Sequence, residues 1–245
     1  MSRAAGLAFS AFAYAVFLGT FLYLIAFVGD LPFAPRTVDH GPEAPVAAAV
    51  VINLLLVTLF ACQHSIMARP GFKRVWTRLV PVSMERSVYV LAASLALILL
   101  FTAWRPINGT VWDLTGTFLE LPVWLMFGAG WAIVLISTFL INHFELFGLQ
   151  QAWLNLRNRQ AAEPQLRQPL FYRWVAHPLY SGFFLAFWAA PQMSYGHLLL
   201  ASGMSLFMLI AIQLEERDLT DFFGEAYTRY RRSVGMLAPR FRGGA

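Results

Sequence analysis

Residues 45–67 read PVAAAVVINLLLVTLFACQHSIM, an apolar run that contains no charged side chain and ends close to a histidine. About 20 mostly apolar residues suffice for a helix to cross a hydrocarbon core of about 30 Å. This run is therefore long enough to span a bilayer. Further runs of the same kind predict six crossings, at 6–28, 45–67, 87–104, 121–143, 175–190 and 195–214. The fifth is short and forms a tight hairpin with the sixth.

The composition agrees with this interpretation. Hydrophobic residues make up 58% of the chain and charged residues only 13%, with a mean hydropathy of +0.59. Soluble domains are far more polar. We therefore expect an all-α integral membrane protein, a polytopic helical bundle followed by a cytoplasmic C-terminal helix. No linker-like tract divides the chain, so residues 1–245 are expected to form one domain. Within it, 1–143 would be a four-helix bundle and 170–239 a helical hairpin with its tail.

Basic residues predict the orientation, because Lys and Arg accumulate in short cytoplasmic loops. Loops 29–44 and 105–120 hold one arginine each, and the other basic residues beyond Arg3 gather in loops 68–86 and 144–174 and in the tail. These are Arg69, Lys73, Arg74, Arg78, Arg86, Arg157, Arg159, Arg167, Arg173, Arg217, Arg229, Arg231, Arg232, Arg240 and Arg242. Both termini are thus expected in the cytoplasm of a bacterium, with the chain in its inner membrane. The net charge of +5 reflects this topology and not nucleic-acid binding.

Polar side chains meet the apolar runs at the cytoplasmic level. His64 closes the second run, His143 closes the fourth and His177 opens the fifth, while Glu85, Arg86 and Tyr89 begin the third. Ionisable groups at membrane depth are costly unless they are paired or solvated. The pattern predicts a polar pocket at the inner face. The alternative is that each of these residues only anchors a helix end at the interface.

The last third of the chain carries a denser motif. His177 to Gly182 read HPLYSG, an apolar hairpin leads to Glu215-Glu216, and residues 223–230 read FGEAYTRY. Over about residues 170–239 this pattern resembles the isoprenylcysteine carboxyl methyltransferase and phospholipid methyltransferase superfamily. The segments ERSVY at 85–89 and NHFELFGLQ at 142–150 resemble a narrower branch, the membrane-bound methanethiol S-methyltransferases and their NnrU-like relatives.

The resemblance implies a methyl transfer that uses S-adenosylmethionine at the cytoplasmic face and releases S-adenosylhomocysteine. It implies that the donor is bound by His177, Pro178, Tyr180, Gly182, Glu215, Glu216, Tyr227, Arg229 and Tyr230. Adjacent helical residues point about 100° apart, so only one of the two glutamates shares a face with Leu219. We expect one glutamate to hold the donor and the other to meet an arginine or water. Arg231 and Arg232 are interpreted as an anchor to lipid headgroups.

In the narrower branch the acceptor is methanethiol, a small thiol, and the product is dimethyl sulfide. A thiol reacts as its thiolate, so the site needs a base or a field that favours the anion. His143 and His64 are the candidate bases, with His143 preferred because Asn142 and Glu145 flank it. Arg86 is expected to stabilise the thiolate, Tyr89 to shape the acceptor site, and Glu85 to lie beside them.

Other functions remain alternatives at this stage. An NnrU-like accessory or transport protein would have the bundle without turnover, and an isoprenylcysteine or phospholipid acceptor would need an opening to the lipid. No metal is predicted, because the histidine boxes of di-iron membrane enzymes are missing, although single histidines leave a haem or metal role as a minor alternative. Gly128 and Gly130, inside the fourth run, are interpreted as helix-packing residues and not as a nucleotide-binding loop.

Overall fold

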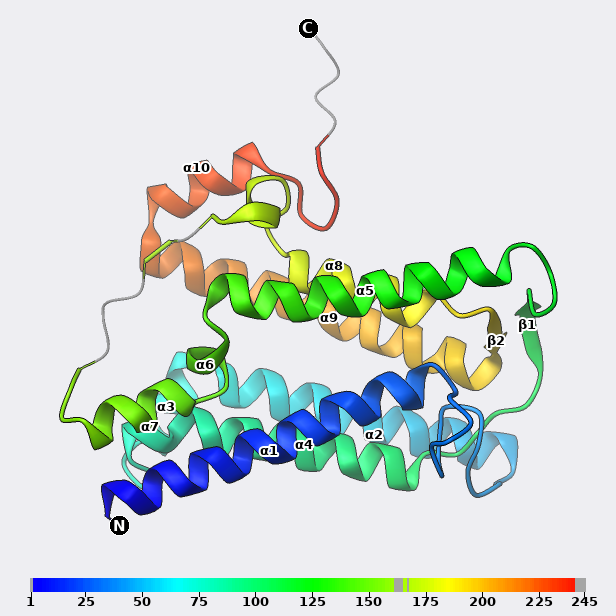
Figure 1. The fold of residues 1–245 in the computed structure, drawn as a ribbon, viewed down its shortest axis with the longest axis horizontal. Coiled ribbons are helices and arrows are strands. Elements are labelled where there is room, and N and C mark those ends of the chain that lie inside the picture. Colours follow the sequence, from blue (N-terminus) through cyan, green and yellow to red (C-terminus); the bar gives the residue numbers. More distant parts are fainter. Residues whose placement is uncertain (1, 161–164, 167, 241–245) are drawn as a thin grey trace, which may run out of the picture. The chain divides into compact units, whose positions relative to one another are not determined.

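The computed structural model describes residues 2–160, 165–166 and 168–240, and apart from two short strands the regular elements of this part of the chain are helices (Figure 1). Arg167 and Arg242, both used to predict the orientation, lie outside these residues. The longer helices are α1 (Arg3–Val28), α2 (Val46–Ala68), α4 (Val82–Ala103), α5 (Glu120–Ile141) and α9 (Tyr195–Phe223). The shorter elements are α3 (Pro70–Trp76), β1 (Thr110–Asp113), α6 (His143–Leu146), α7 (Leu149–Leu156), η1 (Leu170–Arg173), α8 (Pro178–Trp188), β2 (Gln192–Ser194) and α10 (Glu225–Ser233).

Within the described residues, the five longer helices are long and apolar enough to cross a membrane. They confirm a polytopic helical membrane protein. The predicted crossing at 175–190 differs, because α8 has only 11 residues and covers about 16 Å. It ends at Trp188, before Pro191, and the chain continues into β2. The sixth predicted crossing is longer than expected, since α9 continues past both glutamates to Phe223.

The chain forms two compact units that interleave along the sequence. Unit 1 contains the described residues of 1–113, 143–162 and 192–204, and unit 2 contains those of 114–142, 163–191 and 205–245. The segment 114–142 therefore belongs with the C-terminal hairpin, whereas the sequence suggested a boundary after 143. That the whole chain folds as one domain stays a prediction.

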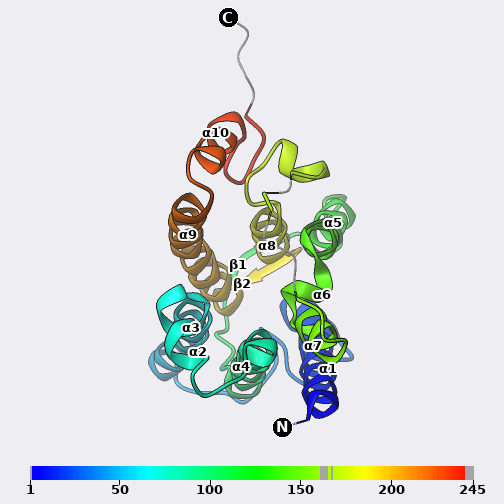
Figure 2. The same cartoon turned by 90° about the vertical axis from the view of Figure 1, so that its left-hand side faces the viewer.

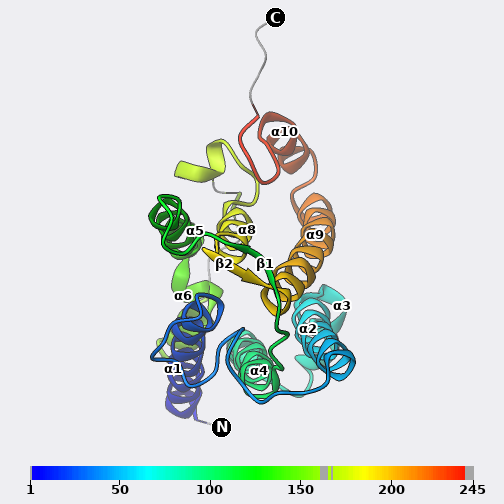
Figure 3. The same ribbon diagram turned by 90° about the vertical axis from the view of Figure 1, so that its right-hand side faces the viewer.

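In unit 1, α4 packs against both α1 and α2, and α7 packs against α1. The end-on views in Figures 2 and 3 place α4 between its two neighbours. Large apolar side chains fill this contact, and the rings of Phe27 and Phe101 lie 5.0 Å apart. The fully buried Asn53 of α2 donates a hydrogen bond of 2.7 Å to the carbonyl of Arg105, just after α4. That bond satisfies both groups where water is scarce.

The two short strands of unit 1 join distant loops. β1 pairs with β2 in an antiparallel ladder, with Thr110 opposite Ser194 and Asp113 opposite Gln192. The turn before α9 is therefore held to the connection between α4 and α5. Asp39 adds a third segment to this junction, because its carboxylate accepts a hydrogen bond from the Ser194 hydroxyl.

In unit 2, α5 and α8 cross at a very short distance. A Cβ atom built on Gly182 would lie 2.7 Å from the Gly130 carbonyl oxygen, and one on Gly130 would lie 2.7 Å from the Ala186 nitrogen. Only glycines permit such an approach. The packing role predicted for Gly130 is confirmed, whereas a Cβ on Gly128 would meet nothing within 4 Å.

Candidate functional site

A polar cluster in unit 2 joins α8 to α9. His177 is the N-cap of α8, which begins at Pro178 as the sequence predicts. The His177 Nε2 lies 3.0 Å from the Glu216 Oε1, and the Tyr180 hydroxyl donates to the Glu215 Oε2 at 3.0 Å. Adjacent glutamates thus take different partners, because they point to different sides of the same helix. The structure therefore brings together four of the residues predicted to bind the donor.

Arg231 of α10 also belongs to this cluster. Its Nε donates a hydrogen bond to the Glu216 oxygen that faces His177. The interpretation of Arg231 as a headgroup anchor is wrong, because its guanidinium is paired and its side chain is only 23% exposed. The neighbouring Arg232 is exposed, which fits the predicted anchor. One glutamate was expected to meet an arginine, and the structure identifies that glutamate as Glu216.

Two buried tyrosines of α10 lie beside the cluster and differ in their hydrogen bonds. The Tyr230 hydroxyl donates to the backbone carbonyl of Tyr172 at 2.8 Å and also approaches that of Val175. Among the residues that the structure describes, the Tyr227 hydroxyl is buried without a hydrogen-bond partner. Tyr227 as a whole is 3% exposed. A buried hydroxyl without a partner is costly, so the Tyr227 hydroxyl could donate to a polar group of a bound molecule.

Burial controls the protonation of these phenols. Desolvation raises the pKa of Tyr230 to about 12. It raises the pKa of Tyr227 and of Tyr172 further above the usual range, and the charge of Glu215 contributes to the higher pKa of both. All three tyrosines are therefore neutral hydrogen-bond donors at physiological pH, and none of them can act as a base.

The remaining donor-site predictions have other surroundings. Gly182 lies at the crossing of α8 with α5, so its described contacts concern helix packing. Pro178 is buried at the first position of α8, where its missing N–H costs nothing. Arg229 lies on α10, on the same short helix as the two tyrosines. A role for these three residues in donor binding stays a prediction.

The C-terminal segment holds His177 in place from the backbone. Residues 174–177 run beside 234–237, and the His177 N–H donates to the Met236 carbonyl at 3.1 Å. The Ser181 hydroxyl donates to the Leu237 carbonyl at 2.7 Å. The chain after α10 therefore folds back along the start of α8 and fixes the position of the histidine.

In unit 1, His64 pairs with a residue of α4. Its Nε2 lies 2.7 Å from the Tyr89 hydroxyl, and the Arg86 guanidinium lies 5.7 Å from the centre of the Tyr89 ring. Such a cation near an aromatic face is favourable. His64, Arg86 and Tyr89 are thus brought together as predicted from their positions, and Glu85 lies half-buried in the first turn of α4.

His143 has a separate, aromatic environment in unit 1. Its Nε2 lies 2.8 Å from the hydroxyl of Tyr14 on α1, and its ring centre lies 4.8 Å from that of Phe147. Burial lowers the pKa of His143, which keeps the imidazole neutral at physiological pH. Tyr14, 129 positions away, was not predicted from the sequence.

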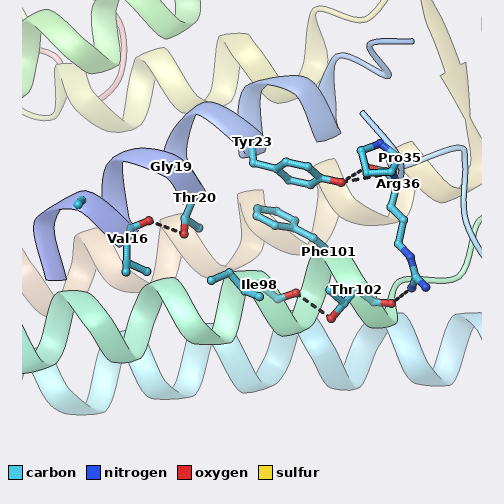
Figure 4. A pocket seen from close by; sticks show the side chains of 10 residues that line it. Val16, Gly19, Thr20, Tyr23, Pro35, Arg36, Ile98, Phe101 and Thr102 are labelled. Atoms are coloured by element: carbon cyan, nitrogen blue, oxygen red, sulfur yellow. Dashed lines mark hydrogen bonds between the residues drawn. The ribbon is translucent and has the colours of Figure 1, made fainter. Parts of the chain in front are cut away.

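A cavity in unit 1 lies elsewhere, between α1, α4 and the segment before Asp39. It has a volume of about 520 Å³ and is lined by Val16, Thr20, Tyr23, Arg36 and Phe101 among others. Figure 4 shows that its polar groups bond to the protein itself: Tyr23 donates to the Arg36 carbonyl at 2.8 Å and Arg36 donates to the Thr102 carbonyl. No residue predicted for catalysis or donor binding is among the described residues that line it.

Comparison with known proteins identifies relatives along nearly the whole chain. The sequence is 52% identical over 239 residues to the methanethiol S-methyltransferase of Mycobacterium tuberculosis, covering 98% of each chain. It is 49% identical to methanethiol S-methyltransferase 1 of Bradyrhizobium diazoefficiens, covering 93% of this chain and 79% of that one. A nurim homolog of Drosophila pseudoobscura pseudoobscura is 28% identical, over 69% of this chain and 70% of its own.

No protein-family model matches the sequence, and no solved structure matches it. The full-length relatives nevertheless agree with the resemblance seen in the segments at 85–89, 142–150 and 170–239. Identity of about half the residues, from end to end, also covers both units of the structure. This chain is a membrane protein that belongs to the methanethiol S-methyltransferase family.

Proposed function

We propose that this protein transfers a methyl group from S-adenosylmethionine to methanethiol and releases dimethyl sulfide. Its relatives carry the name of that activity. The observation that carries the proposal within the molecule is the cluster of unit 2. Beyond the effect of burial, its two carboxylates lie near enough to raise the pKa of Tyr227, whose buried hydroxyl has no hydrogen-bond partner among the described residues. Acidic and hydroxyl groups of this kind suit a cationic ligand that is rich in hydroxyls.

The chemistry of the donor fits the residues of unit 2. S-adenosylmethionine supplies an electrophilic methyl group on a sulfonium, and it also carries an ammonium, a carboxylate and a ribose diol. Glu215 can accept hydrogen bonds from the ammonium or the diol, because its described contact is one hydrogen bond from Tyr180. Tyr227, which stays protonated, can donate to an acceptor of the ligand. Glu216 is already engaged by His177 and Arg231.

The acceptor side of the proposal rests on unit 1. His143 is neutral at physiological pH because burial lowers its pKa, and a neutral imidazole can take the proton of a thiol. Its aromatic neighbours provide an apolar surrounding for a small, volatile substrate. His64, paired with Tyr89, is the second candidate base. Arg86 supplies the positive charge that would favour a thiolate near that pair.

We further propose that the chain lies in the bacterial inner membrane with both termini in the cytoplasm. The positive charge of loops 68–86 and 144–174 supports this orientation. The pairing of β1 with β2 also supports it, since it holds the turn before α9 to the weakly basic connection that follows α4. Because α8 covers only about 16 Å, the chain before it at 174–177 and after it at 189–194 would have to complete this crossing.

The proposal is tested with the purified full-length protein in lipid nanodiscs. Binding of S-adenosylmethionine is measured by calorimetry, and dimethyl sulfide is measured in the headspace after labelled donor and methanethiol are added. We expect donor binding and labelled dimethyl sulfide. A prenylated cysteine and a phospholipid, offered as acceptors in parallel, test the two lipid alternatives. Loss of donor binding in well-folded protein would contradict the enzyme function and favour an accessory role.

A further inference from the structure

One carboxylate oxygen in unit 2 is shared by two basic side chains. The Glu216 Oε1 lies 3.0 Å from the His177 Nε2 and also accepts a hydrogen bond from the Arg231 Nε. The three side chains come from α9, from the start of α8 and from α10. Their exposed fractions are 25% for Glu216, 4% for His177 and 23% for Arg231. This is a partly buried network and not a pair of surface ions.

We infer that Arg231 is a positioning residue of the donor site, which acts on His177 through Glu216. This inference rests on the proposed function, since it assigns a task within the donor site. Arg231 itself need not touch the donor. It holds the Glu216 carboxylate in the orientation in which that carboxylate accepts a hydrogen bond from the His177 imidazole.

The geometry determines how the imidazole is held. When the Nε2 faces a carboxylate, it carries the proton, so in the neutral ring the Nδ1 is the acceptor. A carboxylate behind a histidine is the usual means of fixing both the tautomer and the ring orientation. The arginine fixes the carboxylate in turn, because a guanidinium has rigid donor directions and never loses its charge.

This division separates the two adjacent glutamates by function. Glu216 is used inside the protein, where it joins three helical elements. Glu215 contacts only one neutral hydroxyl among its described contacts, and so it is the glutamate that can receive a positively charged or hydroxyl-rich ligand. Because Arg231 pairs with Glu216, Glu216 has a structural role, and Glu215 stays available to the donor.

The adjacent arginine supplies a matched control. Arg231 and Arg232 are neighbours on α10 with the same charge, but Arg232 is exposed and its side chain is not part of the network. We compare Arg231→Gln with Arg232→Gln in the full-length protein in nanodiscs. The measurements are the dissociation constant for S-adenosylmethionine, the KM for methanethiol and the melting temperature.

We expect Arg231→Gln to weaken donor binding about tenfold, since a hydrogen bond to a charged group is lost from the site. The KM for methanethiol should stay unchanged, and Arg232→Gln should bind the donor like the unaltered protein. Arg231→Lys should rescue only part of the affinity, because lysine restores the charge without the rigid geometry. With Glu216→Gln as background, Arg231→Gln should have little further effect.

Several outcomes would overturn the inference. One is unaltered donor affinity in Arg231→Gln. Another is an equal loss in Arg231→Gln and Arg232→Gln, which would indicate a general charge effect. A fall in melting temperature with unchanged affinity would make Arg231 purely structural. If the unaltered, folded protein fails to bind the donor, then the proposed function fails first, and the inference fails with it.

Discussion

The polar residues of unit 2 and those of unit 1 use different chemistry. In unit 2, two carboxylates meet a histidine, an arginine and a tyrosine hydroxyl. In unit 1, each of two histidines faces one tyrosine hydroxyl amid aromatic rings. The first arrangement suits a charged ligand with many polar groups, and the second suits a small neutral one. The difference indicates that donor and acceptor are recognised by separate sets of residues, and the predictions below test that division or describe one of the two sets more closely.

The largest effect is expected from the predicted base. His143→Ala should lower kcat about 100-fold or more, because general-base catalysis contributes on that order. The dissociation constant for S-adenosylmethionine should not change, since His143 belongs to the acceptor set. His64→Ala is the matched control, and it should have a smaller effect on kcat. If the two variants exchange their effects, His64 is the base, and if His143→Ala loses donor binding, the division between the sets is wrong.

The next effect concerns the glutamate assigned to the donor. Glu215→Gln should weaken binding of S-adenosylmethionine about 100-fold, because it removes a negative charge that a cationic ligand would meet. Calorimetry measures this directly. Asp221→Asn serves as a control, as this exposed carboxylate lies farther along the same helix. Unchanged affinity in Glu215→Gln would remove the carboxylate from the site and leave Glu216 as the alternative.

A smaller effect should separate the two tyrosines of α10. Tyr227→Phe is expected to weaken donor binding about tenfold without lowering the melting temperature, because its hydroxyl has no partner among the described residues. Tyr230→Phe should lower the melting temperature and keep the affinity, because its hydroxyl bonds to the backbone at 2.8 Å. Donor titration and thermal unfolding of both variants test this. The same loss of affinity in both would mean that the whole helix end matters and not one hydroxyl.

The smallest effect is a dependence of stability on pH. The pKa of His143 in the folded protein lies below its ordinary value of 6.5. Below pH 6.5, the unfolded chain therefore binds a proton at this residue more readily than the folded protein does. Stability should therefore fall as the pH drops from 6.5 toward the folded pKa, and the melting temperature should decrease over the same pH range. In His143→Gln, this contribution to the decrease in melting temperature should be absent. An identical pH dependence of the two melting temperatures would show that His143 is not held neutral by burial.

The crossings and the histidine-glutamate motif could be predicted because they depend on local sequence. Apolar runs locate the long helices, and a chemical motif such as His177 to Gly182 remains recognisable in one dimension. The length of α8 was overestimated, because Ala189 and Ala190 are apolar but lie beyond the helix end. Arg231 and Arg232 are indistinguishable in sequence, since the face that α10 turns to Glu216 depends on tertiary packing. Tyr14 was missed for the same reason, as nothing near it in the chain indicates a contact with His143.

The β1–β2 ladder has a consequence for how the last hairpin can enter a membrane. After α8 the chain runs from 189 to 194 without a helix, and in hydrocarbon such a backbone would leave its peptide groups unsatisfied. Asp113 and its neighbours on β1 pair with β2, and the Leu114 N–H donates to the Pro191 carbonyl at 2.9 Å. The strand that supplies these partners is synthesised earlier than the segment that needs them. When the final hairpin inserts, the strand with which β2 pairs is therefore already present. A deletion of β1 would leave the peptide groups of β2 without these partners.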